Sequence, residues 1–393
     1  MRIKNILLSV GLFFMVFLVS CEKDDTKPLS PHKTEQTLFM YMPWSSNLTT
    51  HFEQNLKNFE TTIENNILGN NRVIVFFSSS PTEATLFELK NDGGNCIRKI
   101  FKSYQNPAFT TANGITSILN DVKTIAPANR YAMVVSSHGT GWLPVTPVKT
   151  LRAVEKFHWE YECEGVPLTR FFGGLSPEYQ TNVKTFAEGI TNAGLKMEFI
   201  LFDDCYMSGV EVAYDLKGVT NYLIASPTEV MAYGFPYHII GEHLVNNNYY
   251  AICKGFYDYY KNDQYPYGTI GLINCREVDN LTAIMREINQ RFTFAPELLN
   301  SVQRLDGYSP VIFFDYGDYV SKLCADKKLL TRFESQLERT VPKLYRMHTQ
   351  SYYSMIIGEV NIDTFSGITI SDPSMNAQAI TTKTETAWYK ATH

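Results

Sequence analysis

Short apolar runs alternate with segments of helical periodicity through the first 225 residues. The runs that we expect to form buried strands are 37–41, 72–77, 131–136, 197–202 and 221–225, with a hairpin at 85–89 and 96–101 around Asn91-Asp92-Gly93-Gly94. The segments that we expect to be helices are 47–66, 111–125, 181–193 and 208–216. Strands that alternate with helices favour an α/β fold with a mostly parallel sheet covered on both faces.

An irregular stretch at 143–180 interrupts this first block. A second block of the same type begins after residue 240. Its predicted elements are a helix at 241–262, a strand at 268–274, a helix at 277–293, a strand-like 311–315, a helix at 321–345 and a strand pair around 352–371. The sequence shows no internal repeat and no linker between the blocks. We therefore expect residues 35–393 to form one domain with a C-terminal α/β extension.

Two of the predicted strands end on reactive side chains. The first leads to His138-Gly139-Thr140-Gly141-Trp142, and the second leads to Asp203-Asp204-Cys205. In parallel sheets, chemistry takes place just beyond the carboxyl ends of the strands. A thiol nucleophile and a proton-transfer partner would be delivered in this way. A turn with an incidental histidine and a buried inert cysteine are the alternatives when each segment is taken alone.

The flanking residues refine this hypothesis. The backbone N–H of Gly139 is a natural oxyanion donor, and a helix beginning after Cys205 would favour the thiolate. Acidic neighbours raise the pKa of a thiol, so Asp203 and Asp204 need another role. Asp203 lies two residues before Cys205, on the same side of an extended segment, and is placed to bind a cationic side chain. A cap or a salt bridge is the alternative for Asp203.

The N-terminus has the pattern of an export signal. Arg2 and Lys4 precede an apolar run at 6–19, which ends in Leu18-Val19-Ser20-Cys21. This resembles a bacterial lipobox, which implies a signal peptide at 1–20, lipidation of Cys21 and a flexible tether at 21–34. The chain is then expected at a bacterial membrane, in the outer membrane or at the cell surface. An ordinary signal peptide and an uncleaved anchor helix are the alternatives.

Composition narrows the classes of protein. The chain has 393 residues, 44% of them hydrophobic and 19% charged, with a net charge of −5 and no Lys/Arg tract in its body, so nucleic acid is not an expected partner. Seven cysteines are present, at 21, 96, 163, 205, 253, 275 and 324. The absence of a CxxC pair argues against zinc-ribbon and thioredoxin folds, and we expect few or no disulfides, no metal site and a monomer.

Several segments together resemble the clostripain family of cysteine peptidases, which are relatives of caspases, gingipains and legumains. The histidine segment at 128–142 and the cysteine segment at 202–214 carry most of the resemblance. Further similar segments are 38–47 with the helix at 52–63, 225–229, 234–237 and, more loosely, 314–319 and 366–370. The resemblance covers nearly the whole chain after the signal peptide.

The resemblance implies a caspase-like three-layer α/β/α sandwich and a cysteine endopeptidase that cuts protein or peptide substrates after Arg or Lys. The catalytic residues would be His138 and Cys205, acting as a dyad through an acyl-enzyme, with Gly139 in the oxyanion hole. Asp203 would bind the Arg or Lys, with Glu229 as a further substrate-binding residue. Self-cleavage after the histidine segment would fall at Lys149, Arg152 or Lys156.

The family needs no cofactor, and its calcium dependence varies, but no Asp-rich loop here indicates calcium. The chain departs from the family pattern at Ser136-Ser137, where a Trp and a polar residue are commoner, and at Asp204, where a small residue is usual. Asp204 either widens the preference for cations or depresses thiolate formation. These departures keep a second hypothesis open, a catalytically impaired peptidase-like binding lipoprotein. A third hypothesis is a non-proteolytic thiol enzyme such as an amidase.

Overall fold

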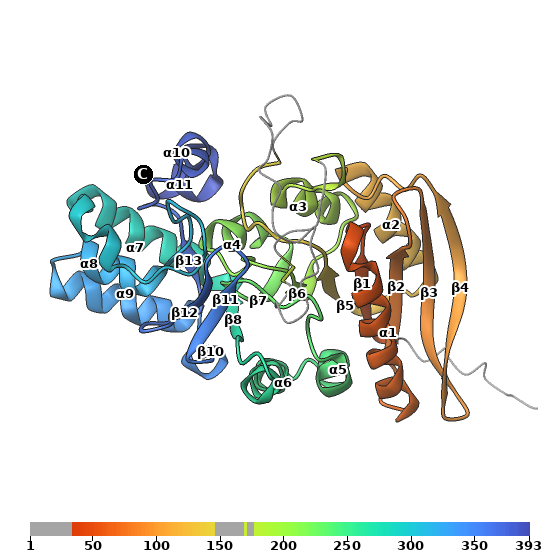
Figure 1. Cartoon of the computed structure of the whole chain (residues 1–393). Coiled ribbons are helices and arrows are strands. Elements are labelled where there is room, and N and C mark those ends of the chain that lie inside the picture. The colour runs from red at the N-terminus through yellow and green to blue at the C-terminus, as the bar shows by residue number, and fades with distance from the viewer. Residues whose placement is uncertain (1–33, 146–168, 171–176) are drawn as a thin grey trace, which may run out of the picture. The chain divides into compact units, whose positions relative to one another are not determined.

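A central sheet organises the chain, and its strand order sets the position of every predicted site residue. The computed structural model describes residues 34–145, 169–170 and 177–393. Strands of this part form a nine-stranded sheet in the order β10-β8-β7-β6-β5-β1-β2-β3-β4 (Figure 1). Its strands are β1 (Thr34–Met42), β2 (Arg72–Ser78), β3 (Glu83–Asp92), β4 (Asn95–Gln105), β5 (Ala128–Ser136), β6 (Met197–Asp203), β7 (Thr220–Ala225), β8 (Thr269–Asn274) and β10 (Met347–His348).

The five central strands β7, β6, β5, β1 and β2 run parallel to one another. β3 and β4 extend the sheet antiparallel on one side, and β8 and β10 do so on the other. The predicted mixed α/β fold with a mostly parallel central sheet is therefore confirmed, with antiparallel strands at both edges.

Helices cover both faces of the sheet and give three layers. Helices α1, α5 and α6 lie on one face, and α2, α3 and α4 lie on the other (Figure 1). Helices α7, α8, α9 and α11 share the core of the second face. The helices are α1 (Thr49–Glu64), α2 (Ala112–Ile125), α3 (Val183–Asn192), α4 (Val210–Leu216), α5 (Tyr237–Val245), α6 (Tyr249–Asn262), α7 (Val278–Arg291), α8 (Tyr316–Leu323), α9 (Lys327–Thr340), α10 (Ala377–Thr382) and α11 (Ala387–Thr392).

The continuous apolar strands follow from burial on both faces. Along β1, Leu38 and Met40 belong to the core under α1, whereas Phe39 and Tyr41 belong to the core on the opposite face. Alternate side chains point to opposite faces of a strand, so both sets must be apolar when helices cover both faces.

Two of the helices predicted from the sequence are wrong, because the structure has two shorter helices in place of each. The segment 241–262 divides into α5 and α6 at Asn247, whose φ of 56° is left-handed and ends the helical path. The segment 321–345 divides into α8 and α9, where the Asp326 side chain accepts hydrogen bonds from the first turn of α9 and starts a new helix.

The C-terminal region braces the loops at the carboxyl ends of β5 and β6. The strand-like segment 311–315 shrinks to β9 (Phe314–Asp315), which pairs with β13 (Thr369–Ile370), and the expected strand pair includes the hairpin β11 (Ser351–Ser354) and β12 (Gly358–Asn361). The Ser208 hydroxyl donates to the carbonyl of Gly367 at 2.7 Å, and the Trp142 indole donates to the Ser371 hydroxyl at 2.8 Å.

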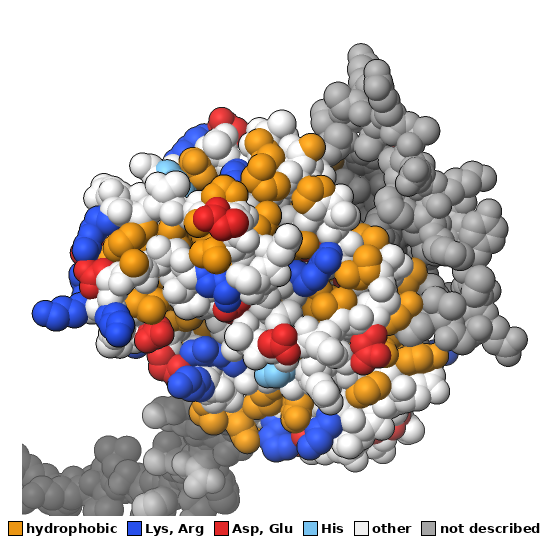
Figure 2. Space-filling view, turned by 60° about the vertical axis from the view of Figure 1, so that its left-hand side comes forward, with side chains coloured by type: hydrophobic (Ala, Val, Ile, Leu, Met, Phe, Trp, Pro, Cys, Tyr) orange, Lys and Arg blue, Asp and Glu red, His pale blue; other side chains and the backbone are white. Residues whose placement is uncertain are grey.

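Residues Lys33–His393 group into one compact unit. The predicted signal peptide, Cys21 and the tether up to residue 33 lie outside the described residues. Within the described part, helices long and apolar enough to cross a membrane are absent. On the face shown in Figure 2, Lys and Arg side chains are interspersed with Asp and Glu. The cysteines at 96, 205, 253, 275 and 324 are free thiols.

Candidate active site

The carboxyl ends of β5 and β6 bring the predicted histidine and cysteine to one edge of the sheet. The strands are parallel neighbours, with Ser136 opposite Asp203 at their ends. His138 and Cys205 each follow two residues later. A Cβ built on Gly139 would overlap the backbone of Cys205, so only glycine fits there. The two segments are therefore in direct contact.

The Cys205 thiol is fully buried, and its hydrogen-bond partner is the backbone of Val230. The Val230 N–H donates to Sγ at 3.1 Å. Burial raises the pKa of the thiol well above its ordinary value, and the Glu229 carboxylate raises it further. Helix α4 begins only at Val210, so the partner of the sulfur is a strand-like backbone rather than the helix terminus that we expected. Because its pKa is raised, the Cys205 thiol is neutral in the uncut chain.

The His138 ring lies between two partners. Its Nδ1 is 2.8 Å from the carbonyl oxygen of Arg170, and its Nε2 is 3.0 Å from Oδ1 of Asn47. Burial lowers the pKa of His138 to about 3, and the hydrogen bond to Arg170 opposes this shift. The imidazole is therefore neutral near pH 7.

Asp203 binds a guanidinium group from its own chain. Arg170 Nη1 lies 2.7 Å from Asp203 Oδ2, and both side chains are fully buried. Arg170 Nη2 donates to Asn55 Oδ1 at 2.6 Å, and Nε donates to the Ala232 carbonyl at 3.2 Å. The guanidinium carbon lies 5.2 Å from the centre of the Phe52 ring. We call this site, formed by Asp203, Asn55, Ala232 and Phe52, the Asp203 pocket.

A glycine leaves room for the guanidinium in the Asp203 pocket. Gly234 has a φ of +69°, and a Cβ built on it would overlap the Arg170 guanidinium. A side chain at residue 234 would therefore strain the backbone and fill the pocket.

Other donors also surround the Asp203 carboxylate. Tyr237 Oη donates to Oδ2 at 2.8 Å, and the Phe235 N–H donates to Oδ1 at 3.2 Å. Burial raises the pKa of Asp203 to about 6, and the Arg170 guanidinium lowers it against that trend. The carboxyl group is thus ionised near pH 7, as an ion pair with Arg170 requires.

The backbone of Arg170 is held as firmly as its side chain. The Gly139 N–H donates to the Arg170 carbonyl at 3.3 Å, on the same oxygen that faces His138. The Arg170 N–H donates to the Val230 carbonyl at 2.8 Å, and Thr169 forms an antiparallel bridge with Met231. Arg170 therefore has its guanidinium in the Asp203 pocket, and its carbonyl oxygen lies beside the Gly139 N–H and the neutral imidazole of His138.

The sequence departures at 136–137 and 204 contact one another. The Ser137 backbone N–H and hydroxyl both donate to the Asp204 carboxylate, the hydroxyl at 3.2 Å. Ser136 Oγ lies 3.4 Å from Asp203 Oδ2. The two serines that precede His138 thus contact the two carboxylates that precede Cys205, one serine to each carboxylate.

The structure brings most of the predicted site residues together and reveals others. Those that gather are His138, Gly139, Asp203, Cys205 and Glu229, the last through a 2.5 Å hydrogen bond from the Thr169 hydroxyl. Lys149, Arg152, Lys156 and Cys21 lie outside the described residues. Sequence reasoning missed Asn47, Asn55 and Arg170. Arg170 is one of several Lys and Arg residues between the two segments, and nothing in the sequence sets it apart from Lys149, Arg152 and Lys156.

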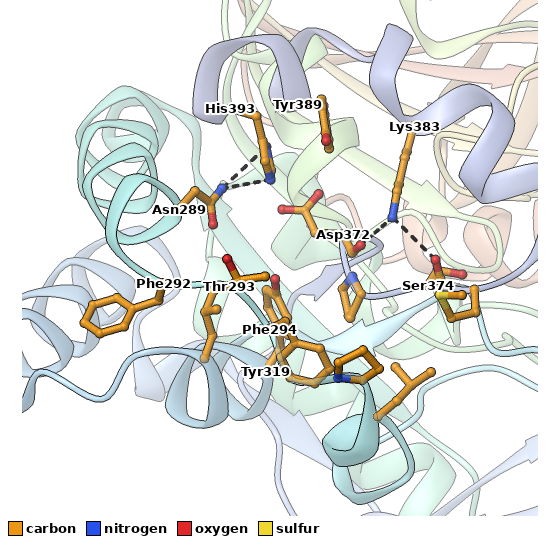
Figure 3. A pocket seen from close by; sticks show the side chains of 15 residues that line it. Asn289, Phe292, Thr293, Phe294, Tyr319, Asp372, Ser374, Lys383, Tyr389 and His393 are labelled. Atoms are coloured by element: carbon orange, nitrogen blue, oxygen red, sulfur yellow. Dashed lines mark hydrogen bonds between the residues drawn. The ribbon is translucent and has the colours of Figure 1, made fainter.

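A cavity of about 310 Å³ lies elsewhere, between α7, α8 and the C-terminal helices (Figure 3). Aromatic side chains such as Phe294 and Tyr319 line it together with Asp372 and Lys383. It contains none of the site residues described above. Within the described residues, His, Cys, Asp and Glu side chains do not gather in threes as metal ligands would.

Comparison with known proteins shows the family of the chain. The family model of Peptidase_C11, the clostripain family, matches residues 180–364. The X-ray structure of "iotapain", a secreted C11 cysteine protease from Bacteroides thetaiotaomicron, is 57% identical, covers 92% of this chain and 100% of its own, and has a TM-score of 0.85. The chain belongs to the clostripain family. It is a cysteine-type peptidase, and the resemblance noted from its sequence is confirmed.

Other clostripain-family structures are similar as well. A clostripain from Bacteroides thetaiotaomicron ATCC 29148, in complex with the peptide inhibitor BTN-VLTK-AOMK, is 61% identical over 56% of this chain and 99% of its own, with a TM-score of 0.55. An inactive zymogen C11 protease from Parabacteroides distasonis is 26% identical over 92% of this chain and 99% of its own, with a TM-score of 0.75. No curated protein matches the chain. Clostripain-family peptidases work without a cofactor.

The fit of Gly139 against Cys205 predicts a large loss of activity for Gly139→Ala. The added Cβ displaces the cysteine backbone and the N–H that faces the Arg170 carbonyl, so we expect kcat/KM for peptide hydrolysis to fall by about 100-fold or more. Gly218→Ala is the matched control, because a Cβ at that position meets open space. Equal activity of the two variants in a reporter-peptide assay would contradict this placement of Gly139.

Proposed function

We propose that this protein is an endopeptidase that cleaves after Arg or Lys, with Cys205 as the nucleophile and His138 as the proton-transfer residue. The observation that carries the proposal is the position of Arg170. Its guanidinium pairs with Asp203, and its carbonyl faces His138 Nδ1 and the Gly139 N–H. A residue held in this way has the contacts of the residue whose carbonyl is attacked, the P1 residue of a substrate.

The reaction would proceed through an acyl-enzyme. The Cys205 sulfur attacks the P1 carbonyl carbon, and the Gly139 N–H stabilises the oxyanion that forms. The C–N bond breaks, His138 gives its proton to the leaving amine, and the P1 residue remains as a thioester on Cys205. Water, deprotonated by His138, then attacks the thioester, releases the P1 carboxylate and restores the thiol.

The protonation states indicate how the nucleophile is activated. Burial raises the pKa of Cys205 and lowers that of His138, so the pair begins as a neutral thiol and a neutral imidazole. His138 must then take the thiol proton as the sulfur attacks. Asn47 lies at Nε2 and holds the ring while Nδ1 faces the reacting carbonyl.

The Asp203 pocket supports a cationic P1 residue, with Arg preferred to Lys. Three acceptors meet different guanidinium nitrogens, namely the carboxylate of Asp203, Oδ1 of Asn55 and the carbonyl of Ala232. A lysine ammonium presents one nitrogen and leaves part of this set unmet. The inhibitor bound to the Bacteroides clostripain carries the sequence V-L-T-K, and this chain has a similar run, Leu168-Thr169-Arg170, with a cationic residue in the last place.

The first substrate would be the chain itself, at the bond between Arg170 and Phe171. The buried guanidinium fills the Asp203 pocket, so another substrate cannot enter until Arg170 leaves. Cleavage of the peptide bond between Arg170 and Phe171 would make Arg170 a new C-terminal residue, which is then able to leave the pocket. The uncut chain is then a zymogen, a state also named for the Parabacteroides relative. Cleavage at Lys149, Arg152 or Lys156 stays a prediction from the sequence, and we propose Arg170 as the residue whose cleavage opens the pocket.

The location of the protein rests on its N-terminal sequence. We propose cleavage before Cys21 and lipidation of that residue, which would anchor a monomeric peptidase to the outer membrane or the cell surface. The relative iotapain is described as secreted, which supports export. Its substrates would be extracytoplasmic proteins or peptides that carry Arg or Lys.

Reporter peptides test the reaction. The chain from residue 22 should cleave Arg reporters, cleave Lys reporters more slowly, and leave Asp reporters intact. Cys205→Ala should abolish this hydrolysis, because the nucleophile is lost. Cys253→Ala, which removes another fully buried thiol, is the control and should keep its activity. Equal cleavage of Arg and Asp reporters would refute the proposed specificity, and activity of Cys205→Ala would refute the nucleophile.

Self-cleavage is tested by sequencing the new N-terminus. Wild-type protein should yield a fragment that begins at Phe171, and Arg170→Gln should stay intact because the Asp203 pocket loses its cation. Variants with Gln at Lys149, Arg152 or Lys156 should be cut as before. A fragment that begins one residue after any of those three positions, and persists in Arg170→Gln, would rule out Arg170 as the activating residue.

The pKa of Asp203 predicts that cation binding depends on pH. With Arg170 in place the pKa is about 6, and because the guanidinium lowers it, the pKa in an empty pocket is higher. Between these two values each pH unit downward should weaken the binding of a guanidinium competitor about tenfold, since the carboxylate must first lose its proton. The inhibition constant of arginine amide on the processed enzyme measures this. A constant that is flat from about pH 8 to about pH 5 would exclude Asp203 as the titrating partner.

A further inference from the structure

The residue before Arg170 has a binding site of its own. The Thr169 side chain is buried, with 4% of the residue exposed, and its backbone pairs with Met231. The next residue donates its N–H to the Val230 carbonyl at 2.8 Å. Thr169 and Arg170 are thus added to the edge of residues 230–231 as a short strand, which is how extended peptides bind to exposed backbone. Thr169 occupies the place of the P2 residue of a substrate.

The hydroxyl of Thr169 meets a carboxylate. Thr169 Oγ1 donates to Glu229 Oε2 at 2.5 Å, and the Met355 N–H donates to the same oxygen at 3.0 Å. The other oxygen, Oε1, accepts from Tyr206 Oη at 2.7 Å. Glu229 has only 2% of its surface exposed. Three of its four donors, namely Met355, Tyr206 and Ser354, belong to the fixed structure, and the fourth comes from the segment in the P2 place.

A buried carboxylate with donors on every side discriminates strongly between hydroxyl and methyl groups. A hydrogen bond to a charged acceptor is stronger than one between neutral groups, and a buried acceptor that loses its donor is destabilised. Valine has the shape of threonine but lacks its hydroxyl. With valine at P2, Glu229 Oε2 would keep the Met355 N–H and lose the stronger contact.

We propose that Glu229 makes this site a reader of P2 hydroxyl groups, so that the enzyme prefers substrates with Thr or Ser directly before the cationic residue. The inference rests on the proposed function, because Arg170 defines the P1 place. It adds a second specificity determinant, which acts through hydrogen bonding at P2 rather than through charge at P1.

Glu229 also contacts the nucleophile loop through Tyr206, which follows Cys205 and has a left-handed φ of 62°. Replacing Glu229 therefore changes overall activity as well as selectivity. The informative quantity is the ratio of kcat/KM between substrates that differ only at P2, because a general loss of activity cancels in that ratio.

The first experiment uses wild-type enzyme and four reporter peptides that share P1 Arg and carry Thr, Ser, Val or Ala at P2. We expect Thr and Ser to exceed Val by about 10- to 100-fold in kcat/KM. Equal rates for Thr and Val, or faster cleavage of Val, would overturn the inference. Cleavage of none of the four, beside cleavage of peptides without Arg or Lys, would instead overturn the proposed function.

The second experiment assigns the preference to Glu229. In Glu229→Gln the Thr-to-Val ratio should fall to a few-fold, because the charge of the acceptor is lost. Glu211→Gln is the control for replacing a buried acidic side chain, since Glu211 is also buried and accepts from the Ser371 N–H at 2.8 Å. A ratio that stays at its wild-type value in Glu229→Gln would show that another group reads P2.

The rate of self-cleavage tests the P2 preference without a substitution at Glu229. Thr169→Ser should be cut between residues 170 and 171 at close to the wild-type rate, and Thr169→Val should be cut about 10-fold or more slowly. Equal rates for the two variants would contradict the role of the hydroxyl in the uncut chain.

Discussion

The buried ion pair between Arg170 and Asp203 is the interaction on which the site depends. A charge buried without its partner destabilises a protein by about 3–5 kcal/mol, so the carboxylate of Asp203 needs a cation or a proton. The pair draws three elements together: α1 through Asn55 and Phe52, the end of β6 through Asp203, and the segment around Ala232. Their arrangement is therefore complementary to a guanidinium, whether that group belongs to this chain or to another peptide.

The sequence alone identified the site residues whose positions follow from a local rule about parallel strands. His138, Asp203 and Cys205 follow apolar strands, and a parallel sheet brings the carboxyl ends of such strands to one edge. Contacts between distant segments have no such rule. Arg170 and Asn55 are 115 residues apart, and His138 and Asn47 are 91 apart, so their meeting depends on the whole tertiary structure. Likewise, apolar periodicity continued through Asn247 and Asp326, although a left-handed residue and a helix cap end the helices there.

The departures from the family pattern have a common physical explanation. Taken from the sequence, Asp204 is an extra negative charge beside a thiol, and Ser137 is an unrelated change 67 residues earlier. In the structure the N–H and hydroxyl of Ser137 both donate to Asp204. The carboxylate thus fixes the turn that leads into His138. Two changes that look harmful one at a time form a contact across the β5–β6 boundary.

The strand order has a further consequence for a chain cut after Arg170. Every strand on one side of the β5–β6 boundary precedes the cut, and every strand on the other side follows it. The mature enzyme would then be one protomer made of two polypeptides that share one sheet, and separation of the two would expose the edges of two central apolar strands. Such edges associate with other chains readily, and reassembly would become bimolecular. The lifetime of the active enzyme would then be set by how slowly its two polypeptides come apart, rather than by a reversible folding equilibrium.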